Sequence, residues 1–205
     1  MQFVDLRNRA TLLASFEGWT DVSPSPNWSI LVNQAYVEFA WDAEIAIGSG
    51  TIAAVSGELE YVIGGNWKAF LDVSYGGAGL QRSSEEYERY ANPNWRNLAA
   101  GAPARWAQTN FDTLAIIPPP NGTLSIAYRG ITEPAALVND TDVPVGPDRF
   151  HEAIALRAAY LQGSVFAQGQ AIARLDSFQQ RYQEFVVKCK LDVQQGFRRR
   201  RPDEP

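Results

Sequence analysis

The chain lacks the residues on which most metal sites and most nucleophilic catalysts depend. Its 205 residues include one cysteine, Cys189, and one histidine, His151. A single cysteine excludes an internal disulfide and a cysteine-based metal cluster, and a single histidine argues against zinc or copper. The sequence motifs of serine hydrolases, P-loop NTPases and zinc proteases are also missing. We therefore expect no enzyme activity, no catalytic residue, no bound metal and no cofactor.

Long apolar runs and positive charge are scarce as well. No apolar run approaches the roughly 20 residues of a membrane-spanning helix, and acidic residues interrupt the N-terminal stretch, unlike in a signal peptide. The net charge is −5, so no overall positive field attracts nucleic acid. The local exception is the run from Arg198 to Arg201. We expect a soluble protein that is made in a cytoplasm and does not bind membranes.

Aromatic residues, in contrast, are abundant. There are six tryptophans, eight tyrosines and ten phenylalanines, which favours extensive packed surface in a core or an interface. The length fits one domain with an insertion or two small domains, since a domain usually has about 150 residues.

Helical periodicity marks both ends of the chain. Asp5 to Phe16 and Asn27 to about Glu44 predict two helices, the second with Ser25 as its N-cap. The second helix is apolar on most sides, so it should be a central helix or one buried by a neighbouring subunit. After Phe150 the period predicts two long helices, with Gly163 and Gly169 at their join. The last helix carries a near-heptad apolar seam of Leu175, Phe178, Tyr182, Phe185 and Cys189. The position of Cys189 on this seam indicates a buried thiol.

Between Gly48 and Gly130 the pattern changes to short β-rich runs. "TIAAV", "LEYVI" and "AFLDVSY" predict strands, and the glycine-rich "GGNW" and "YGGAG" predict the turns between them. Ser83 and Glu86 form a capping-box pattern that predicts a short helix ending before Pro93.

The stretch "DTLAIIPPPNGTLSIAYRG" predicts a β-hairpin. Its arms are residues 114–117 and 124–128, and Asn121 and Gly122 suit the turn. Proline cannot donate to a strand ladder, so Pro118, Pro119 and Pro120 should close the hairpin or lie on a free edge.

These elements predict an α+β fold. Because the helices at both ends have apolar faces and no other partner, we expect one bundle from residues 1–47 and 131–193. Residues 48–130 would form a β-rich insertion of hairpins and one short helix. Residues 194–205 would form a flexible basic tail, since Gly196 should end the last helix and Pro202 should prevent its resumption.

Isolated polar residues give weak signals for chemistry. His151 beside Glu152 fits a surface or interface histidine better than a catalytic base, because no serine or cysteine nucleophile is near it in sequence. The pair Glu85 and Glu86 fits the N-terminal charge of a helix. Asp140 and Asp142 lie in a polar loop.

Residues Ala104 to Cys189 resemble the head–tail adaptor, or connector, proteins of tailed bacteriophages. The resemblance rests on "LAIIPPPNGTLSIAYRGITEPAALVNDTDVPVGPDRFHEAIALRAAYLQGS" and on the spacing of Phe178, Arg181 and Tyr182 in "LDSFQQRYQEFVVKCK". "WSILVNQAYVEFAW", with Asn33 and Ala35, resembles the second helix of that family, and "GELEYVI" with "FLDVSY" resembles its first β pair.

The resemblance implies a structural protein of the virion neck. Such proteins form a homo-oligomeric ring, often a dodecamer, that binds the portal protein and connects the head to a downstream tail or nozzle protein. DNA passes without sequence specificity through the central channel during genome ejection. On such a subunit, Pro118, Pro119, Pro120, Asn121 and Gly122 would form a contact surface.

The resemblance also implies a portal-binding C-terminal segment. An aromatic side chain beside guanidinium groups is a frequent combination at interfaces. Our hypothesis is that Phe197 fills an apolar portal pocket while Arg198, Arg199, Arg200 and Arg201 pair with acidic portal groups. In the alternative, the arginines touch DNA phosphates in the channel.

Three other readings remain open from the sequence. The protein could be a head-closure or tail-completion factor at another joint of the virion. It could be a small-ligand-binding module whose aromatic residues line a pocket. An enzyme is the least favoured reading, because no catalytic constellation is visible.

Overall fold

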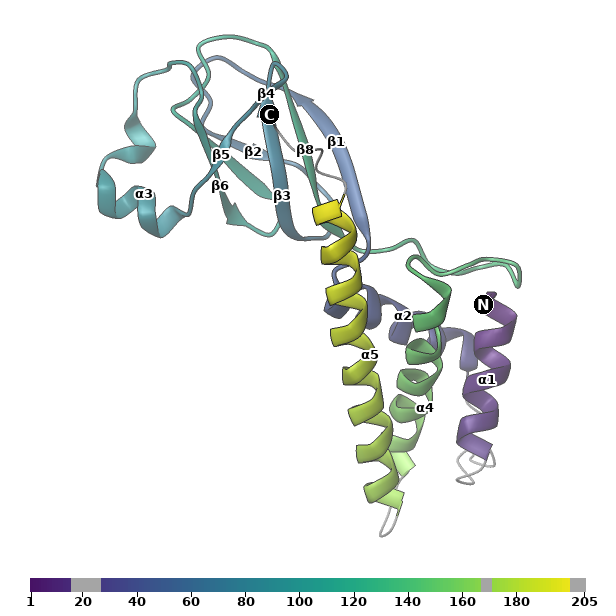
Figure 1. Cartoon of the computed structure of the whole chain (residues 1–205). Coiled ribbons are helices and arrows are strands. Elements are labelled where there is room, and N and C mark those ends of the chain that lie inside the picture. The colour runs from purple at the N-terminus through teal and green to yellow at the C-terminus, as the bar shows by residue number, and fades with distance from the viewer. Residues whose placement is uncertain (16–26, 167–170, 200–205) are drawn as a thin grey trace. The chain divides into compact units, whose positions relative to one another are not determined.

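The computed structural model describes residues 1–15, 27–166 and 171–199 (Figure 1). The fold is α+β, as the sequence predicts. The chain divides into two compact units, a helical one made of Met1–Ala46 and the residues from Pro134 onward, and a sheet-rich one, Ile47–Glu133.

Helices α1 (Phe3–Ser15), α2 (Trp28–Ala43), α4 (Glu152–Phe166) and α5 (Ala171–Arg199) build the helical unit, with a short 3₁₀ turn η2 (Asp148–Phe150) before α4. The predicted apolar stripe of α1, Leu6, Ala10 and Leu13, is buried. Asn27 caps α2, since its side chain accepts a hydrogen bond from the Ile30 N–H. The prediction of Ser25 as the N-cap is therefore wrong; Asn27, like serine, is a favoured N-cap residue, and Ser25 lies outside the described residues.

The central helix of this unit is α4, which packs against α1, α2 and α5. The sequence predicts that α2 is buried on most sides, either as a central helix or by a neighbouring subunit; within this unit it is not the central helix, and Ile30 on α2 is 63% exposed. Helix α4 is rich in alanine on its buried faces, and small side chains let three neighbouring helices approach it closely. Gly163 lies inside α4 rather than at its end, and Gly169 lies outside the described residues.

Arg157 on α4 connects the three helices α2, α4 and α5. Its guanidinium donates to the carboxylate of Glu38 and to Oε1 of Gln179, the latter at 2.6 Å. It also lies 5.3 Å from the ring centre of Tyr182, whose hydroxyl donates to Asp42 at 2.7 Å. Tyr182 belongs to the predicted seam of the last helix, and this seam faces the core, where Leu175 and Cys189 are also buried.

The loop that enters the helical unit after the sheets is held by side chains of α2. The amide of Asn33 accepts from the Leu137 N–H at 2.7 Å and donates to the Leu137 carbonyl at 2.9 Å. The Tyr36 hydroxyl accepts from the Val145 N–H. Asn33 therefore has a structural role. Its side-chain amide satisfies the backbone N–H and carbonyl of Leu137, which have no neighbouring strand to bond.

The sheet-rich unit contains two four-stranded sheets. One has the strand order β1 (Ile47–Ala53), β8 (Ser125–Thr132), β3 (Trp67–Tyr75) and β4 (Ala78–Gly79). The other has the order β2 (Glu60–Val62), β7 (Thr113–Ile117), β6 (Arg105–Asn110) and β5 (Gln81–Arg82). Helix α3 (Glu85–Ala91) and the 3₁₀ turn η1 (Trp95–Asn97) lie between β5 and β6. Side chains of both sheets, including Phe70, Trp106 and Leu114, share one core.

The predicted hairpin of residues 112–130 is wrong. Strand β7 pairs with β2 and β6, whereas β8 pairs with β1 and β3, so the residues between β7 and β8 cross from one sheet to the other. Both arms are strands, as expected, but β-branched runs do not specify which strand pairs with which. The turn from Asn110 to Thr113 joins the true hairpin of β6 and β7.

Of the two predicted glycine-rich turns, one is confirmed as a hairpin turn, whereas "GGNW" connects β2 to β3, which belong to different sheets. Gly76 and Gly77 have φ angles of 57° and 87° and join β3 to β4. Two consecutive positive φ angles match the strand twist of a tight hairpin, and glycine adopts them without steric strain.

Helix α3 begins one residue later than its capping pattern predicts. Ser84, not Ser83, is the N-cap and accepts from the Tyr87 N–H. Ser83 instead donates to the buried carboxylate of Glu88, to which Arg105 on β6 also donates at 2.7 and 3.0 Å. Burial would raise the pKa of Glu88, but these hydrogen bonds outweigh it, so the pKa is lowered.

Part of the aromatic content is explained by a cluster of Trp67, Phe70 and Tyr128. Trp67 stacks on Phe70 with ring centres 5.2 Å apart, and Tyr128 meets both rings edge-on. The rings need glycine beneath them, because a Cβ on Gly50 would lie 2.4 Å from the Tyr128 hydroxyl and one on Gly130 would lie 3.0 Å from the Trp67 ring.

Candidate interaction surfaces

The C-terminal end of α5 carries part of the predicted portal-binding segment. The helix runs through Gly196 to Arg199, so the prediction that Gly196 ends it is wrong. One glycine inside a helix costs only about 1 kcal/mol relative to alanine, and a long preceding helix tolerates this. Phe197, Arg198 and Arg199 thus lie on the last turn, where positive charge is favoured by the helix dipole. Arg200 and Arg201, like Pro202, lie outside the described residues.

The segment Pro118–Gly122 is a connection between the sheets rather than a projecting hairpin. Pro119 and Pro120 are buried, and their carbonyls accept from the N–H groups of Gly101 and Gly57, each at 2.8 Å. Asn121 is exposed, while Pro118 and Gly122 are half-buried. A contact surface here remains a proposal and would centre on Asn121.

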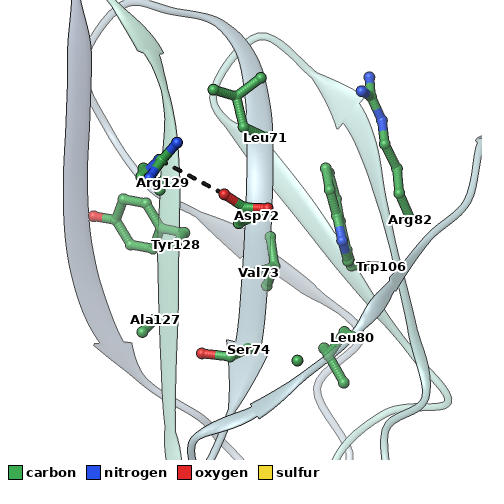
Figure 2. A pocket seen from close by; sticks show the side chains of 11 residues that line it. Leu71, Asp72, Val73, Ser74, Leu80, Arg82, Trp106, Ala127, Tyr128 and Arg129 are labelled. Atoms are coloured by element: carbon green, nitrogen blue, oxygen red, sulfur yellow. Dashed lines mark ion pairs between the residues drawn. The ribbon is translucent and has the colours of Figure 1, made fainter. Parts of the chain in front are cut away.

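A groove of about 450 Å³ lies beside β3 in the sheet-rich unit (Figure 2). Leu71, Val73, Leu80 and Trp106 provide much of its apolar lining, and Trp106 is 1% exposed. The guanidinium of Arg82 lies 5.5 Å from the ring centre of Trp106.

Two more charges line this groove. Asp72 on β3 and Arg129 on β8 form an ion pair at 3.6 Å, shown as the dashed line in Figure 2. A neighbouring hollow of about 410 Å³ shares Arg82 and reaches Lys68 and Gln108. Sequence reasoning missed this surface, because its residues come from β3, β5, β6 and β8 and no local motif joins them.

His151 is buried, which corrects the expectation of a surface or interface histidine. It is 0% exposed and immediately precedes α4. Its Nε2 lies 3.2 Å from the Gly146 carbonyl, and its Nδ1 lies 3.4 Å from the Met1 amino group and 3.3 Å from Asp148. A neutral ring that donates from Nε2 and accepts at Nδ1 fits the contacts with Gly146 and Met1, and the Met1 amino group also donates to Asp148 at 3.2 Å and so lies between the two acceptors. Burial, and next the positive amino group, lower the pKa of His151.

We expect the helical unit to lose stability as the pH falls below about 6.5, the usual pKa of a histidine. The pKa of His151 is lower in the folded chain than in the unfolded chain, so the unfolded chain takes up this proton first as the pH falls. The contribution of neutral His151 to the free energy of unfolding is therefore present above the unfolded pKa and is lost as the pH falls below it. Urea unfolding between pH 7.5 and 5.5 measures the effect, and His151→Gln should flatten the profile. If the free energy of unfolding changed equally with pH in the parent chain and in His151→Gln, the assignment of this pH dependence to His151 would be contradicted.

The other candidate chemical groups are structural. Cys189 is buried, as predicted, and burial raises its thiol pKa to about 11, which keeps it protonated and unreactive. Asp142 accepts from the backbone N–H groups of Val138 and Asn139 and so shapes its own loop. Among the described residues, no cluster of three or more His, Cys, Asp or Glu side chains could hold a metal ion. Within the same ranges, no helix is long and apolar enough to cross a membrane.

A comparison with models of protein families identifies the family to which the chain belongs. The model of the family described as SU10 adaptor protein matches residues 1–202. The chain belongs to the SU10 adaptor protein family. The match covers both the helical and the sheet-rich unit, and it agrees with the resemblance to phage head–tail adaptors. No curated protein gives a significant match.

Membership in the SU10 adaptor family makes the chain a phage adaptor protein and a component of the virion. Adaptors are structural proteins that contact other virion components. The surfaces described above are therefore best considered as places of protein–protein contact.

Proposed function

We propose that the protein forms a ring on the portal and connects the phage head to the tail, leaving a channel for DNA. The observation that carries this proposal is the match of an adaptor family over residues 1–202, nearly the entire chain. In this role the protein sits in the virion neck, contacts itself and the portal, and receives a downstream tail or nozzle protein on its other side.

Helix α5 supports a role in assembly. Val193 on this helix packs on the helical core, and the helix continues to Arg199. In the proposed role the end of α5 reaches the portal, and an aromatic residue followed by arginines suits such a contact.

The outer face of α5 supports contact between copies. Val187 and Leu191 are one helical turn apart, and they are 56% and 52% exposed. Paired apolar side chains on an exposed helix face favour burial in an interface. A ring needs such a contact to repeat from head to tail around a closed circle.

We expect the ring to be absent or marginal in the isolated protein and to form on the portal. The net charge of −5 makes free copies repel one another somewhat. Sedimentation and negative-stain imaging of the protein, alone and mixed with portal, test this. Rings only in the mixture are the expected result, and a monomer in both samples would contradict the proposed function. A stable ring without portal would contradict only the order of assembly.

A further inference from the structure

Strand β3 has one paired edge and one largely open edge. Towards β8 it pairs from Trp67 to Tyr75. On its other side, β4 pairs only with Ser74 and Tyr75. An open strand edge presents backbone donors and acceptors to any extended segment that lies beside it.

The pairing with β4 continues by one backbone hydrogen bond to Val73, so the open part of the edge is Trp67 to Asp72, where Phe70 is met by a side chain. The Phe70 N–H donates to the side-chain oxygen of Gln108 at 3.2 Å, and the Val73 carbonyl accepts from the Leu80 N–H at 2.9 Å. A side-chain amide can rotate away and leave the Phe70 N–H to an incoming backbone carbonyl. The register shift between Phe70 and Asp72 is a local irregularity of the kind that limits edge-to-edge aggregation without excluding a specific partner.

The groove in Figure 2 is lined by β3 together with Leu80, Arg82 and Trp106 on the side of the open edge and residues 127–129 of β8 on the paired side. Its apolar lining includes the half-buried Leu71 and Leu80 and the buried Trp106. A volume of about 450 Å³ accommodates aliphatic side chains of an added strand. Pockets for alternate side chains next to a free strand edge are what strand-addition sites use for specificity.

The charge along the groove is positive. Asp72 and Arg129 offset each other at 3.6 Å. Arg82 is exposed, lies over the Trp106 ring, and forms no ion pair with another described residue. A guanidinium held by an aromatic ring is pre-oriented to bind a carboxylate through two hydrogen bonds.

We propose that the open edge of β3 binds an extended segment of another protein as an added strand. An aliphatic side chain of that segment occupies the groove between Leu71 and Leu80, and an acidic side chain pairs with Arg82. The partner is thus a protein with a β-forming, acidic segment. This site belongs to the sheet-rich unit and is independent of the proposed portal contact of α5.

The probe is an mRNA-displayed library of random nonapeptides, selected on the immobilised full chain. Enriched peptides should alternate apolar and polar residues and carry Asp or Glu. A consensus peptide from the selection is then measured by fluorescence anisotropy. N-methylation of alternate backbone nitrogens should weaken its binding at least tenfold, because an added strand binds through its backbone.

Two variants of the groove and one matched control complete the test. Leu71→Lys places a charge in the groove, and Arg82→Glu reverses the charge beside Trp106; each should weaken binding of the consensus peptide at least tenfold. Arg89→Glu, the same charge change on the exposed face of α3, should leave binding unchanged. Melting temperatures show whether each variant folds, and Arg82→Glu, at an exposed residue, remains informative if Leu71→Lys does not fold. Failure of any peptide to be enriched, a basic consensus, or equal binding to the folded groove variants would overturn the proposal.

Discussion

Replacing Gly130 with alanine is expected to destabilise the sheet-rich unit by about 2–3 kcal/mol, the upper range for overpacking a well-packed core. The added Cβ would lie 2.5 Å from the Ala69 carbonyl oxygen and 3.1 Å from the Phe70 Cα. Both atoms belong to the backbone of β3, so the clash cannot be relieved by rotating a side chain. Strands β3 and β8 would have to separate at the centre of their sheet.

The matched control for this change is Gly79→Ala on β4. No heavy atom lies within 4 Å of a Cβ built there, and Gly79 is not among the residues with positive φ. We expect its unfolding free energy to stay within about 0.5 kcal/mol of the parent, as for most surface substitutions. Urea unfolding followed by circular dichroism and tryptophan fluorescence compares the two variants. If Gly130→Ala were as stable as Gly79→Ala, the close approach of β3 and β8 would be refuted.

Truncation after Val193 is expected to abolish portal binding while leaving the fold intact. The shortened chain loses Phe197 and the arginines that follow, which the proposed function places against the portal. Gln194 and Gln195, the first residues removed, are exposed, whereas Val193 packs on the helical core and is retained. The melting temperature should therefore change little, while the affinity for portal should fall at least 100-fold, as expected when an aromatic and several arginine contacts are lost together.

Removal of Pro202–Pro205 alone serves as the control and should preserve portal binding. Binding of the truncated chain to portal at full strength would rule out the C-terminal contact. The salt dependence separates the two hypotheses for the arginines. Contact with DNA phosphates predicts DNA binding that weakens steeply with salt and is lost on truncation, whereas contact with the portal predicts no such DNA binding.

The features that the sequence alone determined are local ones. The apolar stripe of α1 and the seam of α5 follow from a helical period that makes one face apolar, and that face must be buried wherever the helix packs. The burial of Cys189 follows from its place on the seam. The turn at Gly76 and Gly77 follows from positive φ angles that few other residues adopt. The family resemblance was also contained in the sequence, because it depends on residue patterns along the chain.

Only the tertiary structure decided which elements meet. Strands β7 and β8 looked like the two arms of one hairpin, yet their partners lie elsewhere in the sequence, since strand pairing depends on packing between sheets rather than on local propensity. His151 became a buried residue because Met1 and the loop at Gly146 come together around it. The groove beside β3 has no signature in the sequence for the same reason: Leu71, Leu80, Arg82 and Trp106 approach one another only when β3, β5 and β6 are in place. Local periodicity records which face of an element is apolar, but not which distant segment covers that face or leaves its edge open.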